Sequence, residues 1–298
     1  MKKNPVISIG EIVWDQFAET TVLGGAPLNV AYHLHAQGWP AMIISRVGND
    51  ELGRKTIDQV KKLGLPVQGI QQDPVLPTGR VQVSLDDRNQ PHFDIAAPAA
   101  WDNIQLEETL SFVGDTRYHL VFGTLAQRNE TSRQVIARLC DKALSRFYDV
   151  NLRPPYTPAG HVRRSLAAAD VLKVNREELL TINDWFIKQG GPEEDIANAL
   201  LTAFDLSLLA VTDGANGARL ITRDQSVFHA GFPVPAADPV GSGDAFFSAL
   251  IIGYLSGLPL EVCLERANRA GAYVASQTGA TPEYPENGNQ GPRQIQEE

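Results

Sequence analysis

A run of small residues that leads directly into an apolar helical pattern is the most informative segment of the chain. Residues 238–244 read Asp-Pro-Val-Gly-Ser-Gly-Asp, and apolar residues follow at once. Glycine allows a backbone geometry and a close approach that side chains would block. The consecutive N–H groups of Gly241, Ser242 and Gly243 would form a concave anion site at a helix start, where the helix dipole also favours negative charge. The segment therefore predicts a phosphate-binding loop.

Asp244 closes this segment, and a carboxylate beside a phosphate site is electrostatically costly unless it has a function. One interpretation is a helix cap, a role that Asp often takes. The other is a general base that removes the proton from a hydroxyl group attacking phosphorus. The adjacent Gly-Ser-Gly run favours the base. Neither the G-x-x-x-x-G-K-[ST] pattern nor a G-x-G-x-x-G pattern is present at this loop, so the two common nucleotide motifs do not explain it.

A second polar group stands inside an apolar helical pattern near the N-terminus. The turn formed by Gly24 and Gly25 precedes Pro27, which suits the first turn of a helix. Asn29 lies inside this helix, and a buried Asn must be hydrogen-bonded. A structural network would satisfy it, but the glycine turn favours a ligand hydroxyl as its partner. Asp15 is a further carboxylate in apolar company and a weaker candidate.

The elements that must position these groups alternate along most of the chain. Nearly continuous apolar runs are typical of strands buried on both faces, and they occur at 6–10, 41–47, 118–124, 147–151, 171–175 and 206–212. Helical patterns lie between them, one of which begins after Asn49 or Asp50 and ends at Gly64. This alternation predicts an α/β fold with a mostly parallel central sheet and helices on both faces.

Two stretches depart from this alternation and predict a separate small sheet. Residues 80–86 alternate between apolar and polar side chains, a pattern typical of a strand with one wet face. A turn at 87–89 and a second strand at 90–95 complete a hairpin. We expect a small antiparallel β lid and a large α/β domain, although a surface meander without function is the alternative. The expected boundaries are 11–23 and 79–97 for the lid, and 1–10, 24–78 and 98–298 for the large domain.

The composition limits the class of protein and its partners. A chain of 298 residues with 43% hydrophobic and 20% charged residues is neither disordered nor a small disulfide scaffold. Its net charge of −9 disfavours nucleic acid and anionic membranes, but backbone N–H groups can bind phosphate without many basic residues. No stretch approaches the roughly 18 apolar residues of a membrane span, and the apolar run at 6–9 is too short for a signal peptide. Cys140 and Cys263 suit buried free thiols, so we expect a cytoplasmic protein.

Taken together, the motifs resemble one enzyme family and occur in that family's order. The stretch of residues 24–53 resembles the first signature of the PfkB (ribokinase-like) carbohydrate kinases, and residues 238–244 resemble the second. Between them, Asn175-Arg176-Glu177-Glu178 is similar to the N-x-x-E motif, and residues 211–217 resemble the T-x-G-x-x-G nucleotide segment. Residues 149–153 match a D-x-N-x-R stretch of the sugar-kinase branch. Five motifs in register span most of the chain, and their character is most similar to bacterial fructokinases.

The resemblance implies a ribokinase-like three-layer fold and transfer of the γ-phosphoryl group of ATP to a sugar hydroxyl. Asp244 would be the base, and the N–H groups of Gly241, Ser242 and Gly243 would stabilise charge on the transferring group. The implied sugar-binding residues are Asp15, Gly24, Gly25, Asn29 and Arg153, of which Arg153 could instead reach the γ-phosphate.

The nucleotide side follows from the same resemblance. The implied nucleotide-binding residues are Asn175, Thr212, Gly214, Gly217 and Asn268. Asn175 and Glu178, three positions apart at a helix start, would also order Mg²⁺ through water, which suits a hard cation that keeps part of its hydration shell. A simple capping pair is the alternative interpretation of these two residues.

Two departures from the family pattern occur in the second signature. Pro239 and Ser242 stand where the family usually has Thr and Ala. Because the anion site uses backbone N–H groups, we expect activity to survive, but the change weighs against a monovalent cation (K⁺) on this loop. The resemblance also implies that the lid covers the sugar and excludes water, and that lids pair in a homodimer.

Fructose, converted to fructose 6-phosphate, is the substrate that the resemblance favours. Ribokinase and 2-keto-3-deoxygluconate kinase are alternatives within the class, and nucleoside kinases fit less well. A catalytically silent sugar- or nucleotide-binding regulator on the same fold is the alternative from another class. The carboxylate of Asp244 beside an intact glycine pair argues against it, since a silent relative needs no carboxylate there.

Overall fold

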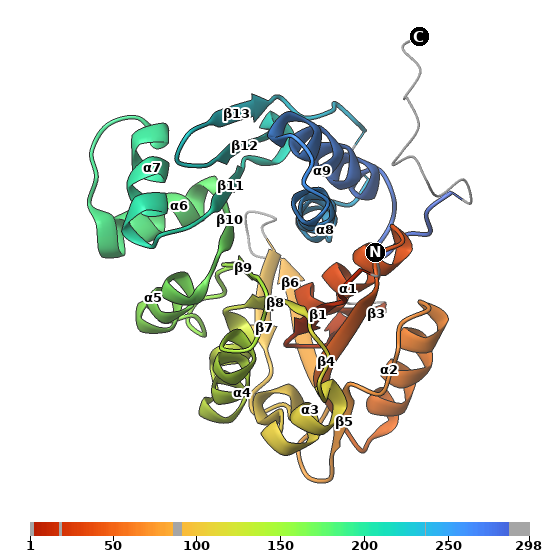
Figure 1. Cartoon of the computed structure of the whole chain (residues 1–298). Helices are drawn as coiled ribbons and strands as arrows, with labels where there is room; N and C mark the ends of the chain where they lie inside the picture. Colours follow the sequence, from red (N-terminus) through yellow and green to blue (C-terminus); the bar gives the residue numbers. More distant parts are fainter. Residues whose placement is uncertain (1–2, 18–19, 86–90, 236, 286–298) are drawn as a thin grey trace.

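A large mixed sheet forms the centre of the molecule (Figure 1). The computed structural model describes residues 3–17, 20–85, 91–235 and 237–285. Within them, the strands of this sheet are β1 (Val6–Ile9), β4 (Ala41–Gly48), β5 (Ile70–Asp73), β8 (His119–Gly123), β9 (Arg146–Asp149), β10 (Val171–Asn175), β11 (Leu208–Thr212), β12 (Ala218–Ile221) and β13 (Ser226–His229). Their order is β13-β12-β11-β10-β9-β8-β1-β4-β5.

All neighbouring pairs from β11 to β5 are parallel, and only β12 and β13 at one edge are antiparallel to their neighbours. The strands that lie inside the sheet are buried on both faces, which explains their nearly continuous apolar sequences. The predicted mostly parallel sheet is confirmed.

Helices cover both faces of this sheet and give three layers. They are α1 (Ala26–Ala36), α2 (Glu51–Lys62), α3 (Leu106–Val113), α4 (Glu130–Cys140), α5 (Ala159–Ala168), α6 (Arg176–Ile182), α7 (Glu193–Ala203), α8 (Ser242–Leu255) and α9 (Leu260–Ala275). Helices α3 to α7 contribute to one hydrophobic core, and α1, α2, α8 and α9 to the other. The two cores lie on opposite faces of the sheet because alternate residues of each strand point to opposite sides.

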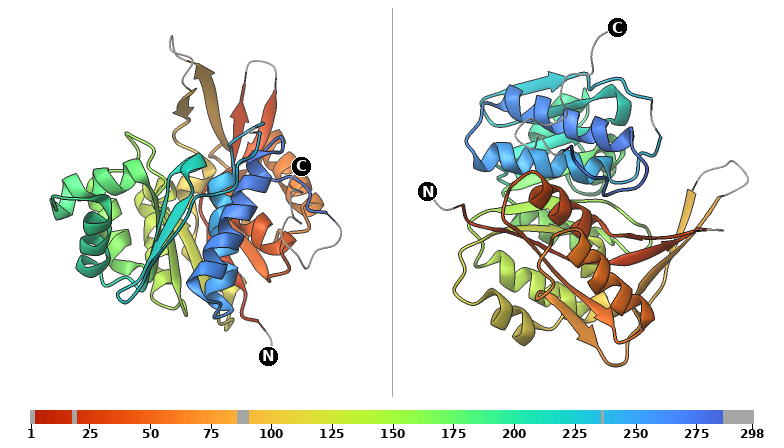
Figure 2. Two further views of the ribbon diagram at one scale, coloured as in Figure 1. Left: turned by 90° about the horizontal axis from the view of Figure 1, so that it is seen from above. Right: turned by 90° about the vertical axis from the view of Figure 1, so that its right-hand side faces the viewer.

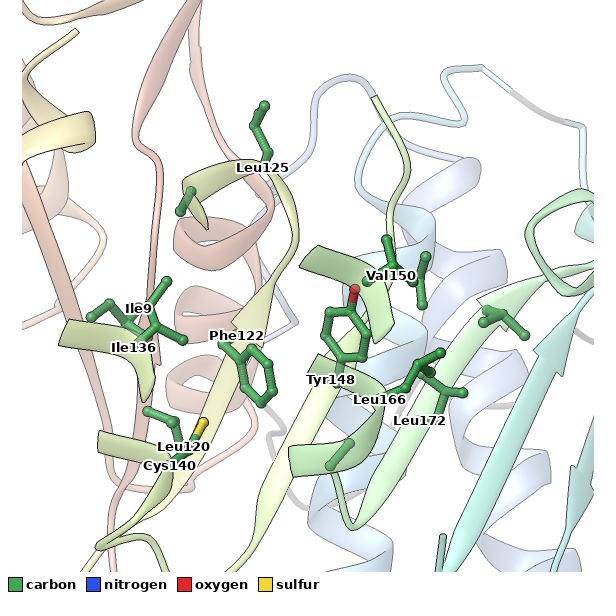
Figure 3. Packing of buried hydrophobic residues seen from close by; sticks show 14 of the residues in the cluster. Ile9, Leu120, Phe122, Leu125, Ile136, Cys140, Tyr148, Val150, Leu166 and Leu172 are labelled. Carbon is green, nitrogen blue, oxygen red and sulfur yellow. The ribbon is translucent and has the colours of Figure 1, made fainter. Parts of the chain in front are cut away.

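The first core shows how this packing positions the ends of the strands. Phe122 on β8 and Tyr148 on β9 stack with ring centroids 5.0 Å apart. Figure 3 labels both residues among the packed side chains of this core. Just beyond these rings, Thr124 Oγ1 donates to the carbonyl of Val150 at 2.6 Å. The carboxyl ends of β8 and β9 are therefore held together by apolar packing and a buried hydrogen bond.

The predicted helix limits around residues 50–64 are confirmed. Asp50 caps α2, because its Oδ1 accepts a hydrogen bond from the N–H of Gly53 at 2.7 Å. Gly64 follows the helix with a φ of +78°, a left-handed conformation that glycine adopts without strain.

A second, four-stranded sheet stands away from the main body (Figure 2). In the described residues its strands are β2 (Val13–Gln16), β3 (Thr21–Gly24), β6 (Gly79–Leu85) and β7 (Pro91–Ile95), in the order β3-β2-β6-β7. The predicted hairpin is present as β6 and β7, while its turn at 87–89 lies outside the described residues. Both outer pairs are antiparallel as predicted, but the central pair β2–β6 is parallel. Each of these two strands begins a hairpin that leaves the main domain, so both run outward in the same direction.

The small sheet is tied to the main domain by a hydrogen bond as well as by the chain. Trp14 on β2 donates its indole N–H to Thr56 Oγ1 on α2 at 2.9 Å, and both residues are buried. The base of the sheet therefore has a fixed position on the large domain.

Candidate active site

The predicted chemical residues gather where the carboxyl ends of parallel strands meet the first turns of α1 and α8. Open α/β sheets bind ligands at this edge. Asp149 ends β9, Asn175 ends β10 and Thr212 ends β11. Asp244 lies in the first turn of α8, opposite Asn29 in the first turn of α1.

The glycine loop has the geometry of an anion site. Gly241 has a φ of +81°, and a Cβ on it would lie 2.7 Å from the Cα of Ala280, so only glycine fits without strain. The N–H of Ser242 is directed at the carbonyl of Pro239, at 3.2 Å. In the part of the chain that the structure describes, the N–H groups of Gly241 and Gly243 donate to no protein acceptor. Two of the three predicted donors are thus free to bind an anion.

Asp244 does not cap α8. The N-cap position is Gly241, without a side-chain hydrogen bond, and Asp244 Oδ2 instead accepts a hydrogen bond from Asn29 Nδ2 at 2.8 Å. Burial, together with the negative charge of Asp149, raises the pKa of Asp244 to about 6, against the lowering effects of Lys173, Asn29 and Arg153. A carboxyl group with this pKa is mostly ionised near neutral pH and can accept a proton.

The side-chain amide of Asn29 uses its nitrogen in a hydrogen bond, while its oxygen has no hydrogen-bond partner among the described residues. Its Nδ2 binds Asp244, whereas its Oδ1 is buried and has no hydrogen-bond partner among the described residues. A buried acceptor without a partner is costly, so it favours an added donor such as a ligand hydroxyl. The prediction that Asn29 contacts the sugar therefore stays a prediction, with Oδ1 as the available atom.

The glycine turn before Asn29 is required by close packing. Gly25 has a φ of +114°, and a Cβ there would lie 2.5 Å from the carbonyl oxygen of Glu11. A Cβ on Gly24 would lie 2.7 Å from Asp15 Oδ2, so the bare backbone leaves room for this carboxylate. The turn thus brings Asp15, Glu11 and the start of α1 together.

The positive charge of Arg153 acts on three carboxyl groups. Burial raises the pKa of Asp15 to about 6 and that of Glu11 to about 7, and the charge of Arg153 lowers both. The same guanidinium lowers the pKa of Asp244. Glu11 was not predicted from the sequence as a site residue; it is buried, and its Oε2 has no hydrogen-bond partner in the described structure. A carboxylate directly after an apolar strand and a glycine was the signal that could have revealed it.

Asn175 and Glu178 form the capping pair that the sequence left as an alternative. Asn175 Oδ1 accepts from the N–H of Glu178, and Glu178 Oε2 accepts from the N–H of Asn175, both at 2.8 Å. Glu178 Oε1 also accepts from the N–H of Leu152 at 2.8 Å. Burial raises the pKa of Glu178, although the charge of Lys173 lowers it.

The hydrogen bonds that Glu178 accepts determine how the predicted Mg²⁺ site could bind the ion. Each oxygen of Glu178 already accepts a backbone hydrogen bond, so the pair fits a hydrated Mg²⁺ better than direct ligation. Among the described residues, no group of three or more His, Cys, Asp or Glu side chains could hold a metal ion.

The remaining predicted nucleotide residues lie on β11, on the turn after it and on α9. Thr212 Oγ1 donates to the carbonyl of Val174 at 3.3 Å. A Cβ on Gly217 would lie 2.0 Å from the carbonyl oxygen of His229, and Gly214 has a φ of +53°. Asn268 is buried on α9, where its Nδ2 donates to the carbonyl of Leu264 at 2.9 Å. The glycines are therefore required by this turn itself, and their contact with a nucleotide stays a prediction.

Comparison with known proteins assigns the family. Residues 5–287 match the family model described as pfkB family carbohydrate kinase. The chain therefore belongs to the PfkB family of carbohydrate kinases, and its fold is the ribokinase-like α/β fold of that family.

Relatives that match nearly the whole chain have diverged from it in sequence. Fructokinase-2 of Oryza sativa subsp. japonica is 28% identical over 312 residues, covering 95% of this chain and 91% of the relative. An uncharacterized sugar kinase from Pyrococcus horikoshii superposes with a TM-score of 0.81 at 27% identity, covering 93% of both chains. A fructokinase double mutant from Vibrio cholerae O395, in a form with bound fructose, ADP and potassium ion, gives a TM-score of 0.79 at 26% identity, with 94% of both chains covered. No helix among the described residues is long and apolar enough to cross a membrane.

Proposed function

We propose that the protein is an ATP-dependent sugar kinase that converts fructose to fructose 6-phosphate. The observation that carries the phosphoryl-transfer chemistry is the position of Asp244, in the first turn of the helix that the glycine loop begins. Fructose as the acceptor is supported by fructokinase relatives that cover nearly the whole chain at 26 to 28% identity.

The proposed reaction begins with Asp244 as the general base. Its ionised carboxylate accepts the proton of the sugar hydroxyl while the hydroxyl oxygen forms a bond to the γ-phosphorus. The bond between this phosphorus and the oxygen of ADP breaks, and ADP leaves with the bonding electron pair. The N–H groups of Gly241 and Gly243 stabilise the charge on the transferring group. Bound Mg²⁺ would neutralise phosphate charge, and Asn175 and Glu178 would hold its water ligands.

The sugar would lie between the lid and the start of α1. Asp15, the Oδ1 of Asn29 and Arg153 supply two acceptors and a donor for hydroxyl groups, while Gly24 and Gly25 allow close approach. Gly214, Gly217, Thr212 and Asn268 would lie along the nucleotide. The two ligands would then meet at Asp244.

We further propose that two lids pair in a homodimer. Phe17 follows β2 and Val22 lies on β3, and both side chains are more than two-fifths exposed, so they offer apolar surface for such a pairing. Light scattering of the wild type and of Val22→Asp tests the dimer, since a monomeric wild type would contradict it.

A panel of acceptors tests the proposed substrate. ADP formation from ATP is measured with fructose, ribose, 2-keto-3-deoxygluconate and a nucleoside, and the phosphorylated carbon is located by NMR. We expect the highest kcat/KM with fructose and phosphate on its O6. A clear preference for ribose or ketodeoxygluconate would reject fructose while keeping the kinase, and ADP formation with none of the acceptors would support a silent regulator.

A further inference from the structure

A buried ion pair lies beside the glycine loop. Lys173 is in the middle of β10, and its Nζ donates to both carboxylate oxygens of Asp149 on β9, at 2.9 and 2.8 Å. Only 8% of Lys173 and 4% of Asp149 are exposed. The two residues are also directly opposite in the parallel register of these strands. Burying two charges is costly, and two apolar side chains in the same place often stabilise a fold equally well. The ion pair therefore suggests a role beyond stability.

The ammonium group of this pair is close to the proposed transfer site. A Cβ built on Gly243 would lie 3.4 Å from Lys173 Nζ and 3.7 Å from its Cε. Gly243 carries one of the two loop N–H groups that donate to no protein acceptor among the described residues, and the next residue is Asp244. The positive charge therefore lies close to a donor that would bind a phosphoryl group.

Several other charged or polar groups act on Asp244, and each comes from a different element. Asn29 on α1 and Arg153 in the loop after β9 stabilise its ionised form, as Lys173 does. Asp149 opposes ionisation, and Glu11 after β1 is coupled to Asp244 by like charge. The negative charge of Glu178 on α6 acts on Lys173 and raises its pKa, as that of Asp149 does. Lys173 and Asp149 thus act on the base with opposite signs.

We propose that Lys173 and Asp149 form a positioning unit for phosphoryl transfer, in which Asp149 holds the Lys173 ammonium beside the glycine loop. There the ammonium keeps Asp244 ionised and adds positive potential where charge develops on the transferring group. This proposal rests on the proposed kinase function and deepens it. Neither residue needs to touch the substrate.

Two single variants that remove charges of opposite sign provide the first test. Lys173→Met removes the positive charge, so the acidic limb of the kcat–pH profile should move to higher pH. Asp149→Asn removes the negative charge, so the limb should move to lower pH. Lys173→Met should also lower kcat about 10²-fold, the usual effect of losing one group that stabilises the transition-state charge, with the sugar KM nearly unchanged.

The double variant Lys173→Met/Asp149→Asn keeps the test valid if a single variant fails to fold, because it removes both charges of the pair and leaves neither partner buried alone. We expect its acidic limb near that of the wild type and its kcat still reduced. Asp170→Asn is the control, since Asp170 pairs with Arg146 beside the opposite ends of β9 and β10. This control variant should have the same acidic limb of the kcat–pH profile as the wild type.

The proposal would be overturned if the acidic limb of the kcat–pH profile moved in the same direction in both single variants. A double variant with the kcat of the wild type would also overturn it. Either result would leave the pair a purely structural role. Carbon-13 NMR titration of Asp244 in each variant measures its pKa without turnover. Opposite pKa shifts in a protein that phosphorylates no acceptor would reject the proposed function while retaining the electrostatic coupling. Unchanged pKa values in an active kinase would reject the coupling alone.

Discussion

Asn29 donates its Nδ2 to Oδ2 of Asp244 at 2.8 Å and so joins two side chains that lie 215 positions apart in the sequence. Asn29 belongs to the first turn of α1, beside the glycine turn and Asp15. Asp244 belongs to the first turn of α8, beside the glycine loop. The bond therefore connects the proposed sugar side to the proposed phosphate side and fixes one oxygen of the base.

This hydrogen bond also sets the protonation of Asp244. A donor to a carboxylate stabilises the ionised form, so Asn29→Ala should raise the pKa of Asp244 above its value of about 6. The acidic limb of the kcat–pH profile should move up by roughly one pH unit, which corresponds to loss of one hydrogen bond to a charged group. Asn198→Ala, at an exposed position on α7, is the control. A limb that stays in place in Asn29→Ala would show that this bond does not act on the base.

Catalysis at the glycine loop should depend on the backbone of the loop rather than on the side chain of Ser242. Ser242 Oγ donates to the carbonyl of Pro239 at 2.7 Å, so Ser242→Ala should keep kcat within about threefold, the effect of one exposed neutral hydrogen bond. Gly241→Ala should lower kcat strongly and destabilise the fold by about 1–3 kcal/mol, because its φ of +81° and Ala280 exclude a Cβ. Steady-state kinetics and thermal unfolding of both variants check this contrast. Equal losses in the two variants would contradict it.

Asp15 should act on the sugar and not on ATP. Asp15→Ala removes a charged acceptor, so we expect the sugar KM to rise about 10- to 100-fold, the loss expected for one hydrogen bond to a charged group. The KM for ATP should stay near the wild-type value. Asp94→Ala is a matched control, because Asp94 is an exposed carboxylate on β7 of the same four-stranded sheet. An unchanged sugar KM in Asp15→Ala would remove this residue from the sugar site.

Glu11 should make the unliganded protein less stable as the pH rises. Its folded-state pKa of about 7 lies above the ordinary value of 4.5, because burial disfavours the charged form. The folded state therefore binds the proton more tightly, and this stabilisation is present below pH 4.5 and lost as the pH rises through about 7. Glu11→Gln should be more stable than the wild type at pH 8, by on the order of 2 kcal/mol, with a smaller difference at pH 5. Denaturant unfolding at both pH values measures this, and a less stable variant at pH 8 would refute it.

Much of the architecture could be predicted because burial on both faces leaves a direct mark on the sequence. The apolar runs of β1, β4, β8 and β10 identify parallel strands, and Asp50 and Gly64 mark the ends of α2. The parallel pairing of β2 with β6 could not be predicted, because the alternation of a strand reveals its wet face but not its partner's direction. That direction depends on where each hairpin leaves the main domain.

The chemistry of the site was predictable only where residue type and local spacing reflect it. The glycine loop and Asp244 follow each other in sequence, so their proximity is evident. The contact of Asn29 with Asp244 and the pairing of Lys173 with Asp149 depend on the order of distant elements. A lysine in the middle of an apolar strand still carried a usable signal, since a buried charge requires a partner.

The most direct test of the central claim is sugar-dependent ADP formation by the wild type and by Asp244→Asn. The variant keeps the size of the side chain and one acceptor oxygen but cannot accept the proton, so we expect kcat with fructose to fall by about 10³-fold or more. ATP binding, measured by calorimetry, should be nearly unchanged, and Asp58→Asn on the exposed face of α2 should behave as the wild type. A variant with near-wild-type turnover would contradict the assignment of Asp244 as the base.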